Sequence, residues 1–290
     1  MGVILDSIIE FIRDLLTGCI LTNLETMFGD VNDRTAAITA EVALGPAAWN
    51  GDIFNLIGNL STSVILPVAG AVVSFVLCGE LISLVVDRNN FHDLDSGFLF
   101  RFLFKACIAV VCLSHTTDIV MGIFEVGHYI VDKAGGVIRT DTGINVGTVV
   151  QAMFSAQLST MELGELCQLC LETFLVSIAM KIIAVLVTVV LYMRMVEIYL
   201  YISVAPLPIS TLISKEWGNV GTNYIKGVSA LALQGFFIMV IVGIYSVLVS
   251  TITVAANLHT ALWSVLGYTL LLCLSLFHTS SISRSVLHAH

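Results

Sequence analysis

Five long apolar stretches limit what this chain can fold into. They cover residues 64–86, 102–124, 174–204, 225–254 and 261–277. A helix needs about 20 residues to cross the roughly 30 Å apolar core of a membrane, and each stretch reaches about that length. Backbone N–H and C=O groups must all be paired inside a membrane. The sequence therefore predicts an all-α fold, a polytopic membrane helical bundle of about five transmembrane helices with amphipathic interfacial helices beside them.

The composition supports a membrane protein and disfavours a nucleic-acid-binding one. Of the 290 residues, 57% are hydrophobic and only 11% are charged, with a mean hydropathy of +0.98. Soluble domains carry about 25% charged residues. The formal net charge is −9, and Lys and Arg are not clustered anywhere. Because binding to phosphates needs clustered cations, any contact with DNA is expected to be transient.

The pattern of polarity divides the chain into five segments. Residues 1–52 are expected to form an extracytoplasmic amphipathic helix and an acidic segment, and residues 53–131 hold the first two spans. Residues 132–166 are expected to be an extracytoplasmic loop with a second amphipathic helix. Three spans and a cytoplasmic hairpin rich in Pro and Trp follow in residues 167–280, and residues 281–290 form a short cytoplasmic tail.

Three local patterns refine these segments. Between Ile4 and Leu16 the apolar residues recur with a period near 3.6, which predicts an amphipathic helix, and residues 23–51 suggest a short helix followed by a connection. Pro67 lies inside an apolar run and predicts a kink. The second span contains the polar sequence Ser-His-Thr-Thr-Asp at residues 114–118, so it is expected to be broken or re-entrant.

Cations near the spans predict the orientation. One side carries six of them in short loops: Arg88, Arg101, Lys105, Lys215, Lys226 and Arg284. The other side carries four across longer segments: Arg13, Arg34, Lys133 and Arg139. The positive-inside rule then predicts a multi-pass protein of the cytoplasmic membrane with the N-terminus outside and the C-terminus in the cytoplasm. The N-terminus lacks the basic and continuous apolar regions of a signal peptide, so insertion is expected to use the spans themselves.

Seven charged residues lie in or near the spans, and they are the candidates for an intramembrane polar site or a lumen. They are Glu80, Asp118, Glu125, Glu172, Lys181, Arg194 and Glu197. A lipid-exposed charge costs at least about 2.5–3.5 kcal/mol at the bilayer centre, so these side chains should face protein or water. Arg194 and Glu197 are three residues apart and can pair on one helical face. Lys181 has no local partner, and a proton relay from it to Asp118 or Glu125 would suit a transporter.

The sequence contains no motif that predicts an enzyme. It lacks a nucleophile elbow, a zinc-protease motif and a phosphate-binding Gly-rich loop, and its histidines show no metal spacing along a helix. The seven cysteines lie mostly in apolar runs and predict no disulfide framework. Cys167 and Cys170 have redox spacing at the start of a span, which leaves thiol chemistry or metal binding as an open alternative. We expect no catalytic residue, no metal and no cofactor.

The most specific motif is a hairpin between the third and fourth apolar stretches. It reads Tyr-Leu-Tyr-Ile-Ser-Val-Ala-Pro-Leu-Pro over residues 199–208, and Glu-Trp-Gly follows at residues 216–218. Pro206 and Pro208 are expected to end the third span, and Trp217 to anchor the loop at the level of the lipid headgroups. Together with Lys215, these residues predict a cytoplasmic hairpin at which partner proteins dock.

This hairpin and the order of spans over about residues 55–280 resemble the TrbL family, also called the VirB-six type. Its members are polytopic inner-membrane components of type IV secretion and conjugation machines. Ala205, Pro206 and Leu207 fall on the helix-ending turn of the family, and Trp217 on its loop aromatic. The lack of a long extracytoplasmic domain is similar to the compact form found in conjugative elements of Gram-positive bacteria.

The resemblance implies a non-enzymatic channel or scaffold subunit that forms a homo-oligomer around or beside the substrate path. Expected partners are membrane lipid, the ATPase and other membrane subunits of the machine, with transient contact to DNA or protein cargo. Two alternatives stay open from the residues alone: a small-molecule or ion-coupled membrane transporter, and a membrane protein related to phages or toxins.

Overall fold

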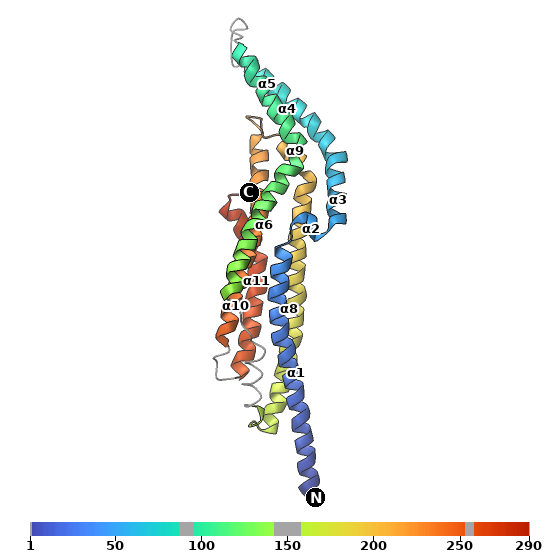
Figure 1. The fold of residues 1–290 in the computed structure, drawn as a ribbon, viewed down its shortest axis with the longest axis vertical. Coiled ribbons are helices and arrows are strands. Elements are labelled where there is room, and N and C mark those ends of the chain that lie inside the picture. Colours follow the sequence, from blue (N-terminus) through green and yellow to red (C-terminus); the bar gives the residue numbers. More distant parts are fainter. Residues whose placement is uncertain (1, 87–95, 142–157, 253–257, 290) are drawn as a thin grey trace. The chain divides into compact units, whose positions relative to one another are not determined.

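The structure is a computed structural model that describes residues 2–86, 96–141, 158–252 and 258–289. Every regular element within them is a helix (Figure 1), which confirms the predicted all-α class. The elements are α1 (Gly2–Val42), α2 (Pro46–Trp49), α3 (Gly51–Leu60), a π-helical turn η1 (Ser61–Ile65), α4 (Leu66–Val86), α5 (Ser96–Ser114), α6 (Thr116–Asp141), α8 (Leu163–Val204), α9 (Pro206–Ile209), α10 (Gly218–Ile252) and α11 (Leu258–Val286).

The helices supply the predicted number of membrane spans. Four are long and apolar enough to cross a membrane: Gly51–Ser83, Leu163–Val204, Gly218–Ile252 and Leu258–Val286. A fifth candidate consists of Phe100–Ser114 and Thr116–Ile138, which meet at a bend of 67°. The bend falls at His115, inside the polar sequence that predicted a broken or re-entrant span. The structure therefore confirms both the polytopic bundle and the position of this break.

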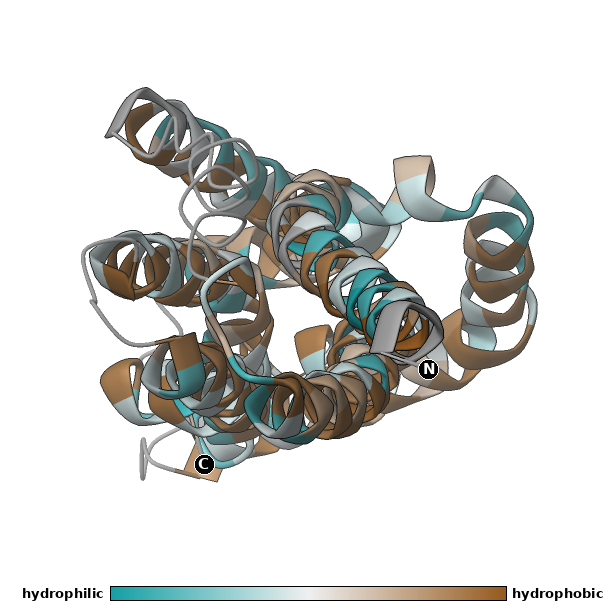
Figure 2. Ribbon diagram, turned by 90° about the horizontal axis from the view of Figure 1, so that it is seen from below, coloured by the Kyte–Doolittle hydropathy of each residue, from teal (hydrophilic) through white to brown (hydrophobic). Residues whose placement is uncertain are grey.

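The long helices are apolar around much of their circumference. In Figure 2, brown, apolar residues recur along them and are not confined to a single face. Many large apolar side chains are exposed, among them Phe75, Phe100 and Val185 at 68%, 70% and 63%. A helix that is hydrophobic all round suits either a deep core or a membrane. Exposed apolar side chains on helices of this length fit direct contact with lipid.

The first span changes its hydrogen-bonding pattern next to Pro67, where the sequence predicted a kink, and it remains one span candidate over Gly51–Ser83. Residues 51–86 run through α3, η1 and α4, and the Leu66 N–H bonds the Ser61 carbonyl five residues earlier. Proline has no N–H to donate, so one α-helical hydrogen bond is missing at this place. The π-helical turn shifts the bonding register just before the proline and keeps the helix continuous. The span begins at Gly51, earlier than the apolar stretch indicated.

Two expectations for the segments before the first span and between the second and third spans meet different outcomes. Residues 2–42 form one 41-residue helix, so the connection predicted within residues 23–51 is wrong as far as Val42. The polar residues there are compatible with a helix because they include good helix formers and no proline before Pro46. The amphipathic helix predicted around residues 146–161 falls mainly outside the described residues.

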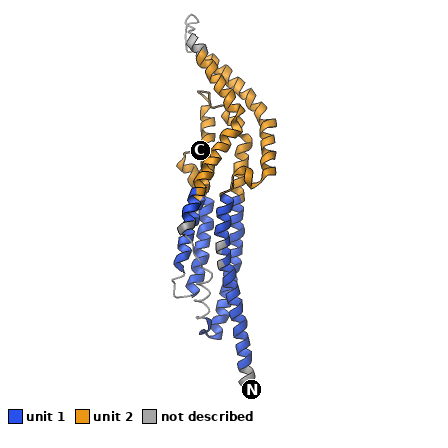
Figure 3. Ribbon diagram, viewed as in Figure 1, with its two compact units in different colours: residues 1–42, 133–191, 238–278 blue, residues 43–132, 192–237, 279–290 orange. Residues whose placement is uncertain are grey.

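The chain divides into two compact units (Figure 3). Unit 1 contains residues 1–42, 133–191 and 238–278, and unit 2 contains residues 43–132, 192–237 and 279–290. Buried apolar side chains of unit 1 come from α1, α8, α10 and α11, and include Ile20, Leu169 and Val265. In unit 2, one core cluster joins side chains of α6, α8, α9 and α10, including Phe124, Ile198 and Leu231.

Candidate functional site

The hairpin between α8 and α10 begins where two prolines end α8. Val204 is the last residue of α8, Ala205 forms a turn, and α9 follows as a single helical turn that starts at Pro206. Neither Pro206 nor Pro208 can donate the backbone hydrogen bond that would extend α8. Pro206 is buried, and the Ser210 N–H bonds its carbonyl at 3.0 Å. The predicted helix-ending role of these prolines agrees with this geometry.

Ser214 organises the second half of the hairpin. Its hydroxyl accepts hydrogen bonds from the backbone N–H groups of Glu216 and Trp217, at 3.3 and 3.1 Å. Its carbonyl accepts the Gly218 N–H at 3.0 Å. A serine at this place satisfies N–H groups of the turn that leads into α10. The backbone of residues 214–218 is thus fixed immediately before α10.

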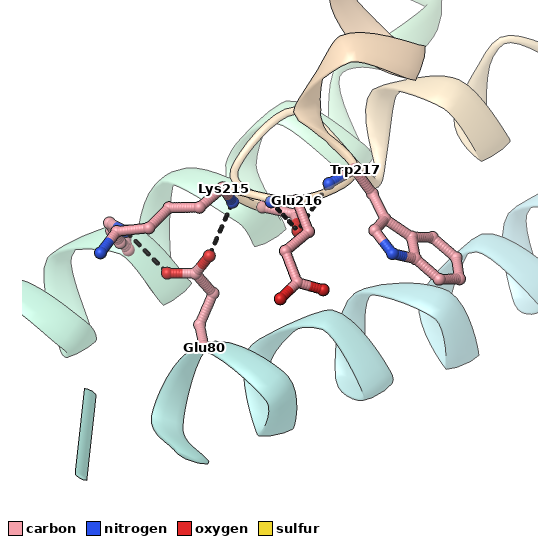
Figure 4. A network of polar contacts seen from close by, with 6 residues as sticks. Glu80, Lys215, Glu216 and Trp217 are labelled. Carbon is pink, nitrogen blue, oxygen red and sulfur yellow. Dashed lines mark hydrogen bonds and ion pairs between the residues drawn. The ribbon is translucent and has the colours of Figure 1, made fainter. Parts of the chain in front are cut away.

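Glu80 of α4 holds this hairpin through two oxygens. One carboxylate oxygen accepts the backbone N–H of Lys215 at 2.7 Å, and the other accepts the Lys105 ammonium of α5 at 2.9 Å. The Glu80 side chain is only 6% exposed, whereas that of Lys105 is 35% exposed. Figure 4 shows the Glu80 carboxylate directed toward the hairpin backbone. We call Glu80, Lys105 and the Lys215 N–H the Glu80 clamp; it connects three elements of unit 2.

An open pocket of about 480 Å³ lies beside the Glu80 clamp. It is lined by one face of α4, including Phe75 and Ser83, and by hairpin residues 214–217. The Trp217 ring is 49% exposed, and its centroid lies 6.2 Å from that of Phe75. In Figure 4 it lies over α4, away from Glu80. The pocket therefore combines an aromatic wall with a charged one.

A close approach fixes α10 against α9. A Cβ atom added to Gly221 would lie 2.7 Å from the Pro208 carbonyl oxygen and 2.7 Å from Leu212 Cγ. Contacts below 3.0 Å are too short for carbon, so only glycine fits here without movement of the hairpin backbone. This requirement ties the first turns of α10 to the Pro-containing turn. The hairpin is therefore closely packed against the start of α10.

The predicted pairing of Arg194 with Glu197 is wrong. Glu197 forms its ion pair with Arg284 of α11, whose guanidinium also lies 5.9 Å from the centre of the Tyr201 ring. The Tyr201 ring stacks on Tyr224 at 5.8 Å, and the Tyr224 hydroxyl donates to the Tyr201 carbonyl at 2.8 Å. The spacing of three residues only makes a pair possible, whereas here Arg194 is buried and Arg284 reaches Glu197 from another helix.

Arg194 and Lys181 have no ion-pair partner within the described part of the chain. Arg194 of α8 is 8% exposed, and its Nε atom is buried without a hydrogen bond. Lys181, also on α8, is exposed among apolar residues such as Ile182, which is 58% exposed. The relay from Lys181 to Asp118 or Glu125 stays untested. Both cations nevertheless lie on a helix that is long enough to span a membrane.

The acids of α6 lie on an exposed face. Asp118, Glu125 and Asp132 are exposed and follow one another at intervals of seven residues. Seven residues are almost two helical turns, so each acid is rotated only about 20° around the helix axis from the previous one. The Asp118 side chain is 78% exposed and contacts the His115 ring nitrogen Nδ1 at 2.9 Å. Other sectors of α6 differ: Val120 and Phe124 are buried, whereas Val126 is 62% exposed. The helix thus has a buried, an acidic and an exposed apolar sector.

Glu172 lies in a separate polar cluster of unit 1. Its carboxylate contacts His259 Nδ1 of α11 at 2.6 Å and accepts a hydrogen bond from Gln168 Nε2 at 3.1 Å. The Glu172 side chain is 19% exposed and that of His259 is 36% exposed. This histidine was only part of a scattered set in the sequence. Glu172 of α8 therefore has a partner, His259, in the first turn of α11.

Comparison with known families decides the class of the chain. A model of the family described as TrbL/VirB6 plasmid conjugal transfer like protein matches residues 31–206, which is more than half of the chain. The chain belongs to this family. No curated protein and no solved structure matches it. The protein is therefore a multi-pass membrane component related to conjugal transfer systems.

The TrbL/VirB6 match covers part of the resemblance found in the sequence. It includes Glu80, Lys105 and the Pro206 turn, and it ends before Lys215 and Trp217. The agreement with residues 55–280 is therefore shown only as far as Pro206. Sequence reasoning identified Glu80, Lys215 and the prolines as candidates, but it missed the pairing role of Lys105 and the capping role of Ser214. A serine four residues before the start of an apolar helix was the local signal for that cap.

Proposed function

We propose that this TrbL/VirB6 family member is a channel or scaffold subunit of a type IV secretion machine for conjugative DNA transfer. It forms homo-oligomers around or beside the substrate path. The observation that carries the proposal is the family match over residues 31–206. The five candidate spans and the absence of a catalytic motif in the sequence fit a structural subunit.

The acidic sector of α6 supports a wet path beside the protein. Asp118 and Glu125 are exposed on a candidate span, where a lipid-facing carboxylate would be costly. An exposed apolar sector lies next to the acidic one, so one side of α6 suits lipid and the other suits water. Discontinuous helices in membranes are tolerated where they line a cavity or are covered by protein. The bend between α5 and α6 fits such a position.

The hairpin is the proposed docking surface for the machine's ATPase. Its residues Pro206, Pro208, Lys215 and Trp217 lie on a backbone that is held by the Glu80 clamp and by the Ser214 cap. A rigid surface loses little conformational entropy when a partner binds, which favours association. The proposal places the hairpin and the C-terminus in the cytoplasm and the N-terminus outside, as the positive-inside rule predicts.

A deletion of the gene in a conjugation donor tests the proposed function. The expected result is a fall in transfer frequency by at least 100-fold, restored when the full chain is supplied from a second locus. Membrane levels of the chain and donor viability serve as controls, because a general membrane defect would lower both. Normal transfer in the deletion strain would contradict the proposal.

A further inference from the structure

Two hydrogen bonds fix how α1 lies along α8 within unit 1. The Arg13 guanidinium donates to the Met161 carbonyl at 2.9 Å, and the Asn23 amide donates to the Thr173 hydroxyl at 3.3 Å. The partners are separated by 148 and 150 residues in the sequence. The two segments therefore run in the same direction, and a residue of α1 lies beside the residue about 149 positions later.

This register brings Cys19 to the two cysteines at the start of α8. Its expected neighbour is position 168, which lies between Cys167 and Cys170. Cys170 lies within electrostatic range of both Cys19 and Cys167. The Asn23 amide also donates to the Cys19 sulfur at 3.8 Å. Three thiols from two helices thus form one group, which we call the Cys19 cluster.

The Cys19 cluster lies at the edge of the α1–α8 packing. Ile20 and Leu24 of α1 and Leu166 and Leu169 of α8 are at most 3% exposed. Cys19 and Cys167 are exposed, and Cys170 is half-buried. The apolar contacts hold the two helices while the sulfur atoms stay open to a small reagent. Buried cysteines are inert, whereas an accessible cysteine can ionise to the reactive thiolate.

We propose that Cys19 and Cys170 form a redox-sensitive disulfide between α1 and α8, with Cys167 as the exchange thiol of the Cys19 cluster. The oxidant is a disulfide compound. The thiolate of Cys167 attacks one of its sulfur atoms, which releases one thiol and leaves a mixed disulfide on Cys167. Cys170, on losing its proton, attacks the outer sulfur and takes over the mixed disulfide, which returns Cys167 to a thiol. Cys19 then attacks the Cys170 sulfur, and a second thiol leaves. One incoming disulfide is reduced to two thiols, and two protein thiols become one disulfide.

The bond would tether two helices that are far apart in the sequence. It would close a loop of about 150 residues, and the restriction of the unfolded chain grows with loop length. A disulfide forms only between cysteines whose Cα atoms are less than about 7 Å apart, so the reaction reports directly on the α1–α8 register. The inference stands on unit 1 alone and is independent of the proposed role in transfer.

Mass spectrometry of the full chain in native membranes tests the disulfide. Membranes are treated with oxidised glutathione, free thiols are blocked with N-ethylmaleimide, and the protein is digested with trypsin without reduction. Cys19 lies in the peptide of residues 14–34, and Cys167 and Cys170 share the peptide of residues 140–181. The expected product is a covalent pair of these two peptides that disappears on reduction and is absent in Cys19→Ser.

A shifted thiol provides the matched control. Cys19→Ser combined with Gly18→Cys keeps one thiol in the same peptide but turns it to a side of α1 where no atom lies within 4 Å of the new Cβ. This variant should give at least tenfold less of the linked pair. Cys167→Ser should keep the linkage, and Cys170→Ser should lower it at least fivefold.

Three results would overturn the proposal. The first is that the shifted control gives as much of the linked peptide pair as the wild type. The second is that Cys167→Ser lowers the amount of this pair more than Cys170→Ser does. The third is a wild-type product that contains only glutathione adducts or a disulfide within the peptide of residues 140–181. None of these depends on transfer frequency, so failure here leaves the proposed function to its own test.

Discussion

At the scale of single residues, the Glu80 clamp predicts a graded loss of hairpin stability. Glu80→Gln keeps an oxygen that can accept the Lys215 N–H but removes the charge that faces Lys105. Glu80→Ala removes both acceptors. Because an unsatisfied buried partner costs about 1–3 kcal/mol, the thermal midpoint of the detergent-solubilised protein should fall in the order wild type, Gln, Ala. Glu216→Gln, which neutralises an exposed acid of the same hairpin, is the matched control and should change the midpoint little. Equal effects of Glu80→Gln and Glu216→Gln would contradict the clamp.

Individual residues also show where sequence reasoning ends. Glu80 and Lys215 were recognisable as an intramembrane acid and a hairpin cation, because both depend only on local hydropathy. Their connection depends on how α4 approaches residues 210–217, which no local pattern encodes. For the same reason Glu197 was assigned to Arg194, three residues away, while its partner Arg284 lies 87 residues later. The Cys19 cluster likewise required the register of α1 on α8.

At the scale of elements, helix ends and breaks were the most predictable features. Pro206 and Pro208 lack an N–H, and the polar residues 114–118 interrupt an apolar run, so both effects act within one or two turns. The length of α1 was not predictable from the same rules. Residues 23–42 contain no long apolar run, and packing of Leu24, Met27 and Ile38 in the core of unit 1 stabilises a helix there. In most helices such packing contributes more than propensity.

The contact between α6 and α10 gives a prediction for one glycine. A Cβ atom at Gly127 would lie 2.8 Å from the Ala232 Cβ and 2.9 Å from its carbonyl oxygen, so Gly127→Ala should separate the helices. Overpacking of this kind costs about 1–3 kcal/mol, visible as a lower thermal midpoint. Gly122→Ala on the same helix meets no atom within 4 Å and should be neutral or stabilising by up to about 1 kcal/mol. Adding Ala232→Gly to Gly127→Ala should recover part of the loss. A midpoint for Gly127→Ala equal to that of Gly122→Ala would show that the helices do not approach this closely.

At the scale of the whole molecule, the number of spans followed from the sequence, whereas the side of each helix that meets water did not. Hydropathy identifies α6 as part of a span, but the burial of Val120 and Phe124 is needed to separate its acidic sector from its exposed apolar sector. The exposed Lys181 of α8 raises the same question, because a charge on an otherwise apolar helix needs water or a partner. Oligomerisation around a wet path would supply both.

Cysteine accessibility decides whether the acidic sector of α6 meets water in the assembled protein. In a background where Cys107 and Cys112 are replaced by Ala, the tryptic peptide of residues 106–133 contains only the introduced thiol. The thiols introduced by Asp118→Cys and Glu125→Cys should react with an anionic, membrane-impermeant methanethiosulfonate at least tenfold faster than the thiol introduced by Val126→Cys. The reason is that a lipid-facing thiol stays protonated and unhydrated. Membrane-permeant N-ethylmaleimide after detergent denaturation must label all three equally, which controls for expression. Equal rates at positions 125 and 126 in native membranes would remove the wet path from α6 while leaving the family and the fold unchanged.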